Sequence, residues 1–165
     1  MFSEGDKIVY PMYGAGVIEG LEQQEIDGVL QTYYVLRIPV GNLKIMISVR
    51  KAEYLGIREV YSGEKALDII RSILKEPIVM SENWNQRYKE NLERIKTGKL
   101  AEVALVFRNL LLRERERGLS SAEKKMLTTA KQIIVSELIL AKGLEKNSAE
   151  ELLQKTVVGA QIVDS

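Results

Sequence analysis

The chain has 165 residues, 45% of them apolar, which is enough for one ordinary globular core or two small ones. It contains no cysteine and no histidine, which excludes disulfide bonds, thiolate metal sites and the commonest general base of enzymes. Residues 1–7 are charged and lack the apolar stretch of a signal peptide, and no apolar run is long enough to span a membrane. We therefore expect a cytoplasmic protein without membrane association.

The formal net charge is +1, but the charges are distributed unevenly. Residues 81–131 contain 12 Lys and Arg against seven Asp and Glu, a local net charge of +5, whereas the segments before and after each have a net charge of −2. A basic middle segment between acidic flanks is compatible with nucleic-acid binding. The pattern is only moderately specific, because exposed helices commonly mix Glu and Lys for solubility.

The first third of the chain has the alternating pattern of β-strands. We predict strands at 7–10, 16–24, 29–38 and 43–49, with a brief fifth strand near 53–56. Asp27-Gly28, which stands between two of these strands, is a strong signal for a tight hairpin turn. Short strands joined by tight turns favour either a small barrel of the SH3 or Tudor type or a strongly bent antiparallel sheet.

From about Gly63 the spacing of apolar residues changes to the 3.6-residue period of helices. We predict helices at 64–75, 84–96 and 99–117, a fourth after the capping box that begins at Ser120, and a terminal helix near the weaker capping box at 148–151. The predicted fold is an α+β chain of two domains: a β module at 1–58 and an all-α bundle of about five helices at 59–165.

Residues that commonly carry catalysis or hold cofactors are absent or wrongly placed. Gly14-Ala15-Gly16 matches part of a dinucleotide-binding loop, but a strand follows it where a helix would be required. No P-loop lysine motif and no nucleophile with a nearby base is recognisable, and the acidic residues are scattered. We therefore expect a protein that is not an enzyme and that uses neither a cofactor nor a metal ion.

The only tryptophan, Trp84, follows the expected N-cap residue Asn83 and stands beside Arg87, Tyr88 and Lys89. A large apolar ring among cations at the positive end of a helix suits a surface that contacts phosphates and unstacked bases. Spacing alone leaves a second interpretation open, in which the indole packs across a domain joint. More distant candidate phosphate contacts, each of which is individually more typical of a solvated helix surface, are Lys124, Lys125 and Lys131.

Three segments form a recognisable set: Gly5-Asp6-Lys7-Ile8-Val9-Tyr10-Pro11 followed by Gly14, Asn83-Trp84 with Arg87-Tyr88-Lys89, and Glu116-Arg117-Gly118-Leu119-Ser120 with Glu123-Lys124 and Met126-Leu127. In this order and spacing, from Met1 to about Gly143, the chain resembles the CarD/CdnL family of bacterial transcription regulators. The resemblance implies a Tudor-like domain that binds the β subunit of RNA polymerase. It also implies a helical domain that contacts promoter DNA at the upstream edge of the transcription bubble.

The resemblance further implies roles for single residues. Trp84 would be a wedge in the minor groove at the upstream fork, with Arg87 and Lys89 near the DNA backbone. RNA polymerase binding would map onto Gln24 and the strand residues Leu43, Lys44, Ile45, Met46 and Ile47. Gln24 and Met46 stand where some relatives have arginine, which leaves docking through a strand edge and apolar contacts and leaves the affinity and ion dependence of docking open.

The functional hypothesis is a monomeric transcription regulator that stabilises the promoter open complex with little sequence specificity. Two alternatives remain open. One is a stand-alone helix-turn-helix protein that dimerises through the β module and shifts DNA without polymerase. The other is an interaction adaptor with Trp84 in its core, which predicts no salt-sensitive DNA contact.

Overall fold

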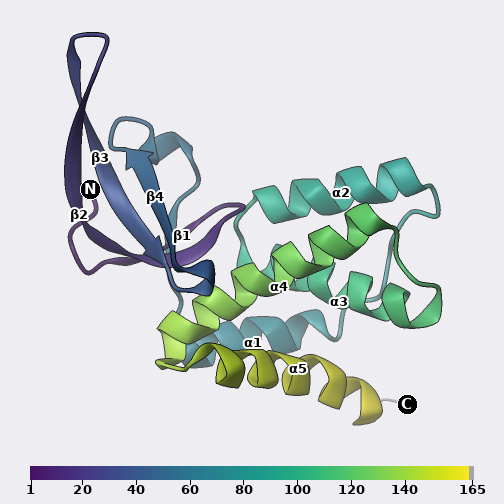
Figure 1. Ribbon diagram of the computed structural model, residues 1–165. Helices are drawn as coiled ribbons and strands as arrows, with labels where there is room; N and C mark the ends of the chain where they lie inside the picture. The colour runs from purple at the N-terminus through teal and green to yellow at the C-terminus, as the bar shows by residue number, and fades with distance from the viewer. Residues whose placement is uncertain (164–165) are drawn as a thin grey trace.

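The computed structural model describes the backbone of residues 1–163 and the side chains of residues 1–158. Within these residues a five-stranded antiparallel sheet is followed by five α-helices, which confirms the predicted α+β class with a β module before a helical bundle. Figure 1 shows the sheet at one end of the molecule and the helices at the other, with α4 extending from the bundle towards the sheet. Residues 164 and 165 of the predicted helical domain lie outside the described residues.

The strands of the described residues pair antiparallel in the order β4-β3-β2-β1-β5. Their bounds are β1 Lys7–Tyr10, β2 Gly14–Ile26, β3 Val29–Ile38, β4 Leu43–Ser48 and β5 Arg58–Glu59. Of the two arrangements that the sequence left open, the observed one is the open sheet rather than the closed barrel. A β-bulge between Ile18 and Gly20 inserts one unpaired residue into β2 and bends the strand there.

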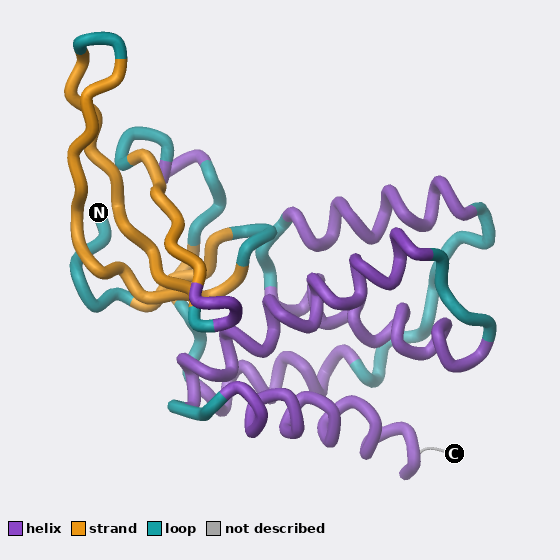
Figure 2. Tube along the Cα trace, viewed as in Figure 1, coloured by secondary structure: helices purple, strands orange, loops and turns teal. Residues whose placement is uncertain are grey.

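Strands β2 and β3 form a long hairpin that projects beyond the rest of the molecule, as Figure 2 shows. Its turn is the predicted Asp27-Gly28, whose φ angles of 53° and 77° are both positive, as a type I′ turn requires. Ile26 and Val29 pair directly beside the turn. Strand β2 is longer at both ends than the predicted 16–24, because it pairs with β1 back to Gly14 and with β3 as far as the turn.

A small hydrophobic core lies on one face of the sheet and consists of Ile8, Ile18, Tyr34, Leu36, Ile38, Ile47 and Ala52. The predicted fifth strand near 53–56 is wrong. Ala52–Tyr54 forms a short 3-10 helix, η2, and the fifth strand is β5, which pairs with β1 instead. So short an apolar segment cannot be assigned to helix or strand from its spacing alone. Strand β5 crosses the predicted domain boundary after residue 58, and the position of that boundary stays a prediction.

The helices are α1 Gly63–Ile73, α2 Trp84–Lys96, α3 Leu100–Glu116, α4 Ser121–Lys142 and α5 Lys146–Val163. The side chains of Ser62, Asn83 and Ser120 accept backbone N–H bonds at the starts of α1, α2 and α4, so the predicted caps of α2 and α4 are present. Helix α5 begins two residues before the predicted capping box at 148–151. No helix in the described part of the chain has the length and apolarity needed to cross a membrane.

The helical core is built around α3 and α4, whose buried side chains include Phe107, Leu110, Ile134 and Leu138. Helix α4 contacts α1, α2, α3 and α5 and also packs against β2. It is therefore the element that connects the bundle to the sheet, and it fixes where the start of α2 stands relative to the β module.

Two polar contacts fix the joint between the modules. Glu137 of α4 is 1% exposed and forms a two-pronged ion pair with Arg58 of β5, with N–O distances of 2.7 and 2.8 Å. The hydroxyl of Ser136, also buried, accepts a 2.8 Å bond from the backbone N–H of Ala15. Gly14 has φ +114°, and a Cβ there would stand 2.7 Å from the Ser136 hydroxyl oxygen, so only glycine fits. The modules therefore meet as one packed unit.

Candidate nucleic-acid interface

The side chain of Trp84 contacts Tyr88 and Ser120 and is otherwise partly exposed. Trp84 is the first residue of α2 and is 41% exposed. Its ring stacks on Tyr88, one helical turn later, with the ring centroids 5.3 Å apart and the planes at 14°. Its indole N–H donates a 3.0 Å hydrogen bond to the hydroxyl of Ser120. An indole sealed in an apolar joint, the second interpretation of the sequence, does not describe this ring.

Ser120 uses its hydroxyl completely. It is the N-cap of α4 and accepts the backbone N–H of Glu123 at 3.2 Å in addition to the indole N–H of Trp84. The hydroxyl donates its single proton to Oε1 of Glu123, also at 3.2 Å. One donor and two acceptor positions are all that a hydroxyl offers. Because every one of them is occupied, Ser120 has one preferred orientation, and the acceptor that the indole meets is fixed.

Glu123, which Ser120 contacts, belongs to a buried ion pair between α2 and α4. Arg87 is 3% exposed and Glu123 is 2% exposed. The distance from Arg87 Nε to Glu123 Oε2 is 2.8 Å, and the distance from Nη2 to Oε1 is 3.2 Å. Arg87 Nη1 donates to the backbone carbonyls of Ser81 and Glu82. Such a pair is favourable only because nearly all of its donors and acceptors are used.

Both members of this pair stay charged. Burial alone raises the pKa of Glu123, but the hydrogen bonds and charge of Arg87, together with hydrogen bonds from Ser120, outweigh it, and the pKa is lowered. The hydrogen bond to Glu123 is the main cause that raises the pKa of Arg87. The structure therefore corrects the prediction for Arg87. Its guanidinium is inside the protein and already bonded, so it positions α2 rather than contacting a phosphate.

The predicted lysine contacts fall into two groups. Lys89, Lys124 and Lys125 are exposed, the first on α2 and the others in the first turns of α4. Lys131 is half-buried and lies 4.0 Å from a carboxylate oxygen of Glu150 on α5, on the side of α4 that faces α5. Lys124 and Lys125 follow Ser120, the residue that contacts Trp84, whereas Lys89 lines a hollow with Glu90, Glu93 and Glu102 and Lys131 has Glu150 as an acidic partner.

Helix α4 offers positive charge to solvent because its two carboxylates are turned inwards. Within this helix, all of which is described, Glu123 is paired with Arg87 and Glu137 with Arg58, and both glutamates are almost completely buried. The exposed charges of α4 are therefore lysines. The local potential is more positive than a count of charges along the sequence suggests.

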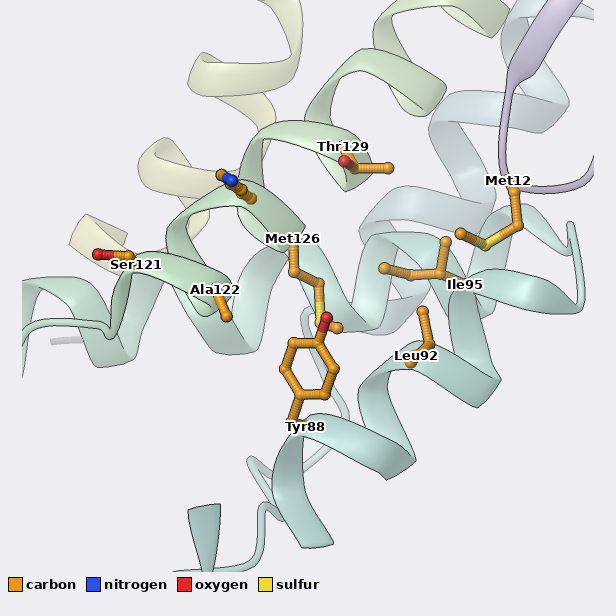
Figure 3. Close-up of a pocket in the computed structure, with 9 residues that line it drawn as sticks. Met12, Tyr88, Leu92, Ile95, Ser121, Ala122, Met126 and Thr129 are labelled. Carbon is orange, nitrogen blue, oxygen red and sulfur yellow. The ribbon is translucent and has the colours of Figure 1, made fainter. Parts of the chain in front are cut away.

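A groove runs between α2 and α4 directly beside the Trp84–Tyr88 stack. It has a volume of about 410 Å³, which lies within the range of roughly 300–1,000 Å³ for ligand pockets. Figure 3 shows the side chains that surround it, with Tyr88, Leu92 and Ile95 contributed by α2 and Met126 by α4. The full lining consists of Met12, Tyr88, Leu92, Ile95, Ser121, Ala122, Lys125, Met126 and Thr129.

The predicted polymerase-binding residues belong to the hairpin of β2 and β3 and to strand β4. Gln24 is exposed near the tip of the hairpin, where it pairs with Gln31. Strand β4 stands at the end of the strand order and, among the described residues, pairs only with β3. Its outer edge therefore presents backbone groups that another strand could pair with. Leu43 and Lys44 at its start are exposed.

Further along β4 the side chains become less accessible. Ile45 and Met46 are half-buried, and Ile47 is 1% exposed within the small core of the sheet. The side chain of Ile47 is therefore not accessible to a partner, so the part of the prediction that concerns Ile47 is limited to its backbone. Alternation along the strand turns this residue inwards. Ile47 can take part in docking only through its backbone.

Sequence reasoning identified Ser120 and Glu123 only as a helix cap. Their contact with Trp84 and Arg87 joins residues 36 positions apart. No spacing rule reaches across that distance, because it depends on how α2 packs against α4. The only sequence signal was that each helix has a charged residue in its first turn, Arg87 in α2 and Glu123 in α4.

Comparison with known proteins identifies the family. A family model described as "CarD-like/TRCF RID domain" matches residues 2–61, and one described as "CarD, C-terminal domain" matches residues 66–154. The chain therefore belongs to the CarD family of transcription regulators, which confirms the resemblance seen in the sequence.

A relative in Bacillus subtilis (strain 168) carries the name "Putative transcription factor YdeB". It is 40% identical to this chain over 144 residues, a region that covers 87% of this chain and 94% of the relative. The similarity thus extends over both modules and includes the segment that carries Trp84.

Proposed function

We propose that this protein binds the β subunit of RNA polymerase through its β module and stabilises the promoter open complex with Trp84. The observation that carries the proposal is the presentation of the indole. It is a partly exposed ring, stacked on Tyr88 and held by Ser120, next to exposed lysines. Membership in a family of transcription regulators supports this assignment.

Docking would use the free edge of β4. A strand at the edge of a sheet can pair with a strand of another protein through backbone hydrogen bonds, and neighbouring side chains then give specificity. Leu43 and Met46 would provide the apolar contacts, with Gln24 on the hairpin nearby. Once the β module is bound, the helical bundle faces DNA at a high effective concentration, so a modest DNA affinity is sufficient. The protein would act as a monomer.

The wedge would act by preference for melted DNA. An apolar side chain between base steps stabilises a distorted or opened minor groove. A ring that contacts the fork of the bubble but not the closed duplex shifts the equilibrium towards the open complex by its difference in affinity. A difference of about 1.4 kcal/mol gives a tenfold shift. Phosphate contacts of Lys89, Lys124 and Lys125 would add affinity without sequence preference.

The lifetime of open complexes formed by the cognate RNA polymerase on a weak promoter tests the proposal. Trp84→Ala should shorten the lifetime by about tenfold relative to the wild-type protein. Tyr54→Ala is a suitable control, because Tyr54 is an aromatic residue that is 84% exposed on the β module. A wild-type lifetime with Trp84→Ala, at unchanged polymerase binding and melting temperature, would contradict the wedge role.

The same variants separate the alternatives. A stand-alone DNA-binding protein would shift duplex DNA equally well without polymerase. An adaptor without DNA contacts would show open-complex lifetimes that are independent of both Trp84 and the lysines.

A further inference from the structure

The groove between α2 and α4 continues from the exposed face of the wedge into the protein. Tyr88 belongs to both, because it stacks on Trp84 and also lines the groove. Ile95 and Met126, both almost completely buried, belong to its lining. Met12, from the turn after β1 in the β module, also lines the groove. In Figure 3 these side chains converge on one space, with the Tyr88 ring beside Met126.

The rim of the groove on the α4 side is polar and basic. Helix α4 contributes Lys125 and the hydroxyl residues Ser121 and Thr129 to the lining. On α2, Lys89 lines a different hollow together with Glu90, Glu93, Arg94 and Glu102, so the lysine of the groove lining is Lys125 on α4. The carboxylates of α4 cannot oppose an anion here, because both are buried in ion pairs. An apolar floor with an aromatic ring and a neighbouring lysine suits the binding of single-stranded nucleic acid.

We propose that this groove receives an unstacked base of the DNA strand that is released next to Trp84. The base would lie against Tyr88 and Met126, and the adjoining phosphate would face Lys125. A peptide segment of the polymerase would also find an apolar floor, but Tyr88 joins this floor directly to the ring of Trp84, which in the proposed function lies at the melted DNA. The proposal rests on the proposed function, since it needs a melted junction at the wedge, and it adds a second site that senses melting.

The two sites should act together. The wedge separates the last stacked pair from the bubble, and the groove then holds one of the bases that separation frees. Stacking of one base on an aromatic side chain lowers its free energy enough to extend the open-complex lifetime by about tenfold. This gain would come in addition to that of Trp84 and would depend on an unpaired base within reach.

The fluorescent base analogue 2-aminopurine tests the proposal in open complexes formed with the cognate RNA polymerase. The analogue is placed in turn at each unpaired position beside the upstream edge of the bubble, on either strand, and the full-length protein is then added. Wild-type protein should change the fluorescence at one position, because the base moves from solvent onto Tyr88. Thr129→Phe fills the groove and should abolish the change.

Matched variants make the result specific. Thr128→Phe adds the same ring one residue earlier, on the exposed side of α4, and should behave as wild type. Lys125→Glu should weaken the apparent affinity, measured by titrating the fluorescence change, at least tenfold. Lys155→Glu, the same charge reversal at an exposed position of α5, should leave this affinity unchanged.

Each outcome either supports or overturns the groove proposal. The groove proposal fails if no position responds to wild-type protein, or if Thr129→Phe responds as strongly as wild type. If Trp84→Ala still shortens the open-complex lifetime in either case, the proposed function survives without the groove. A Thr129→Phe protein that binds polymerase more weakly in the absence of DNA would show that the groove holds a protein segment, which also overturns the proposal.

Discussion

The indole nitrogen of Trp84 lies 3.0 Å from the hydroxyl oxygen of Ser120, the residue that caps α4. This contact links the proposed wedge to the start of a different helix. Through Ser120 it also links the wedge to Glu123 and the buried Arg87. The orientation of the exposed ring therefore depends on Ser120 and on the buried ion pair that Ser120 contacts.

Ser120→Ala should weaken the wedge without removing it. The variant loses the indole acceptor and the cap of α4, and the cap loss costs about 0.5–2 kcal/mol of stability. Loss of one hydrogen bond worth about 0.5–1.5 kcal/mol should shorten the open-complex lifetime roughly two- to tenfold. Ser62→Ala removes the corresponding cap of α1 and is the control. Equal lifetimes for these two variants would show that Ser120 acts only as a cap.

Glu123→Gln should be strongly destabilising. It leaves the Arg87 guanidinium buried without a countercharge, which costs about 3–5 kcal/mol of unfolding free energy. Replacing both partners, as in Arg87→Met with Glu123→Leu, should cost much less than the sum of the single changes. Urea denaturation of the three variants measures this coupling. Additive losses would mean that the two residues do not act as a pair.

Acidification should remove part of the stability that Glu123 provides. Its pKa is lowered in the folded protein, so its contribution is present at pH values above the ordinary value of 4.5 and is lost as the pH falls through the lower folded value. Between pH 7 and pH 3 the wild-type free energy of unfolding should fall more steeply than that of the variant with both partners replaced. Parallel curves for the two proteins would contradict this assignment.

Arg58→Met should loosen the joint between the modules. It leaves the Glu137 carboxylate, which is 1% exposed, without its partner, and the expected loss of stability is about 3–5 kcal/mol. Arg37→Met is a matched control, because Arg37 pairs with Glu19 at the surface, where a pair contributes only about 0–1 kcal/mol. Thermal melts compare the two, and equal losses would argue against a buried ion pair at the joint.

Met46→Glu should abolish capture of the polymerase β subunit. Met46 is half-buried on the edge strand β4, and a carboxylate there would be desolvated at an apolar contact. Val79→Glu places the same charge on the helical module, at a residue that is 73% exposed, and should leave capture unchanged. Unimpaired capture by Met46→Glu would place the docking surface elsewhere.

Local chemistry was sufficient to predict most elements. The positive φ angles of Asp27 and Gly28 and the caps at Asn83 and Ser120 are decided within a few residues, so the hairpin and the starts of α2 and α4 could be found. The segment at 53–56 was predicted wrongly, because a run that short has no resolvable period. The actual fifth strand, β5, depends on pairing with β1, which lies far away in the chain.

The sequence by itself determined the fold class, the family and the position of Trp84 at a helix start. Only the tertiary structure decided which charges face solvent. Arg87 and Lys89 are two positions apart, yet one is buried against Glu123 and the other is exposed. The reason is physical. Burial and ion pairing depend on the packing of α2 against α4, and residues two apart on a helix point in different directions.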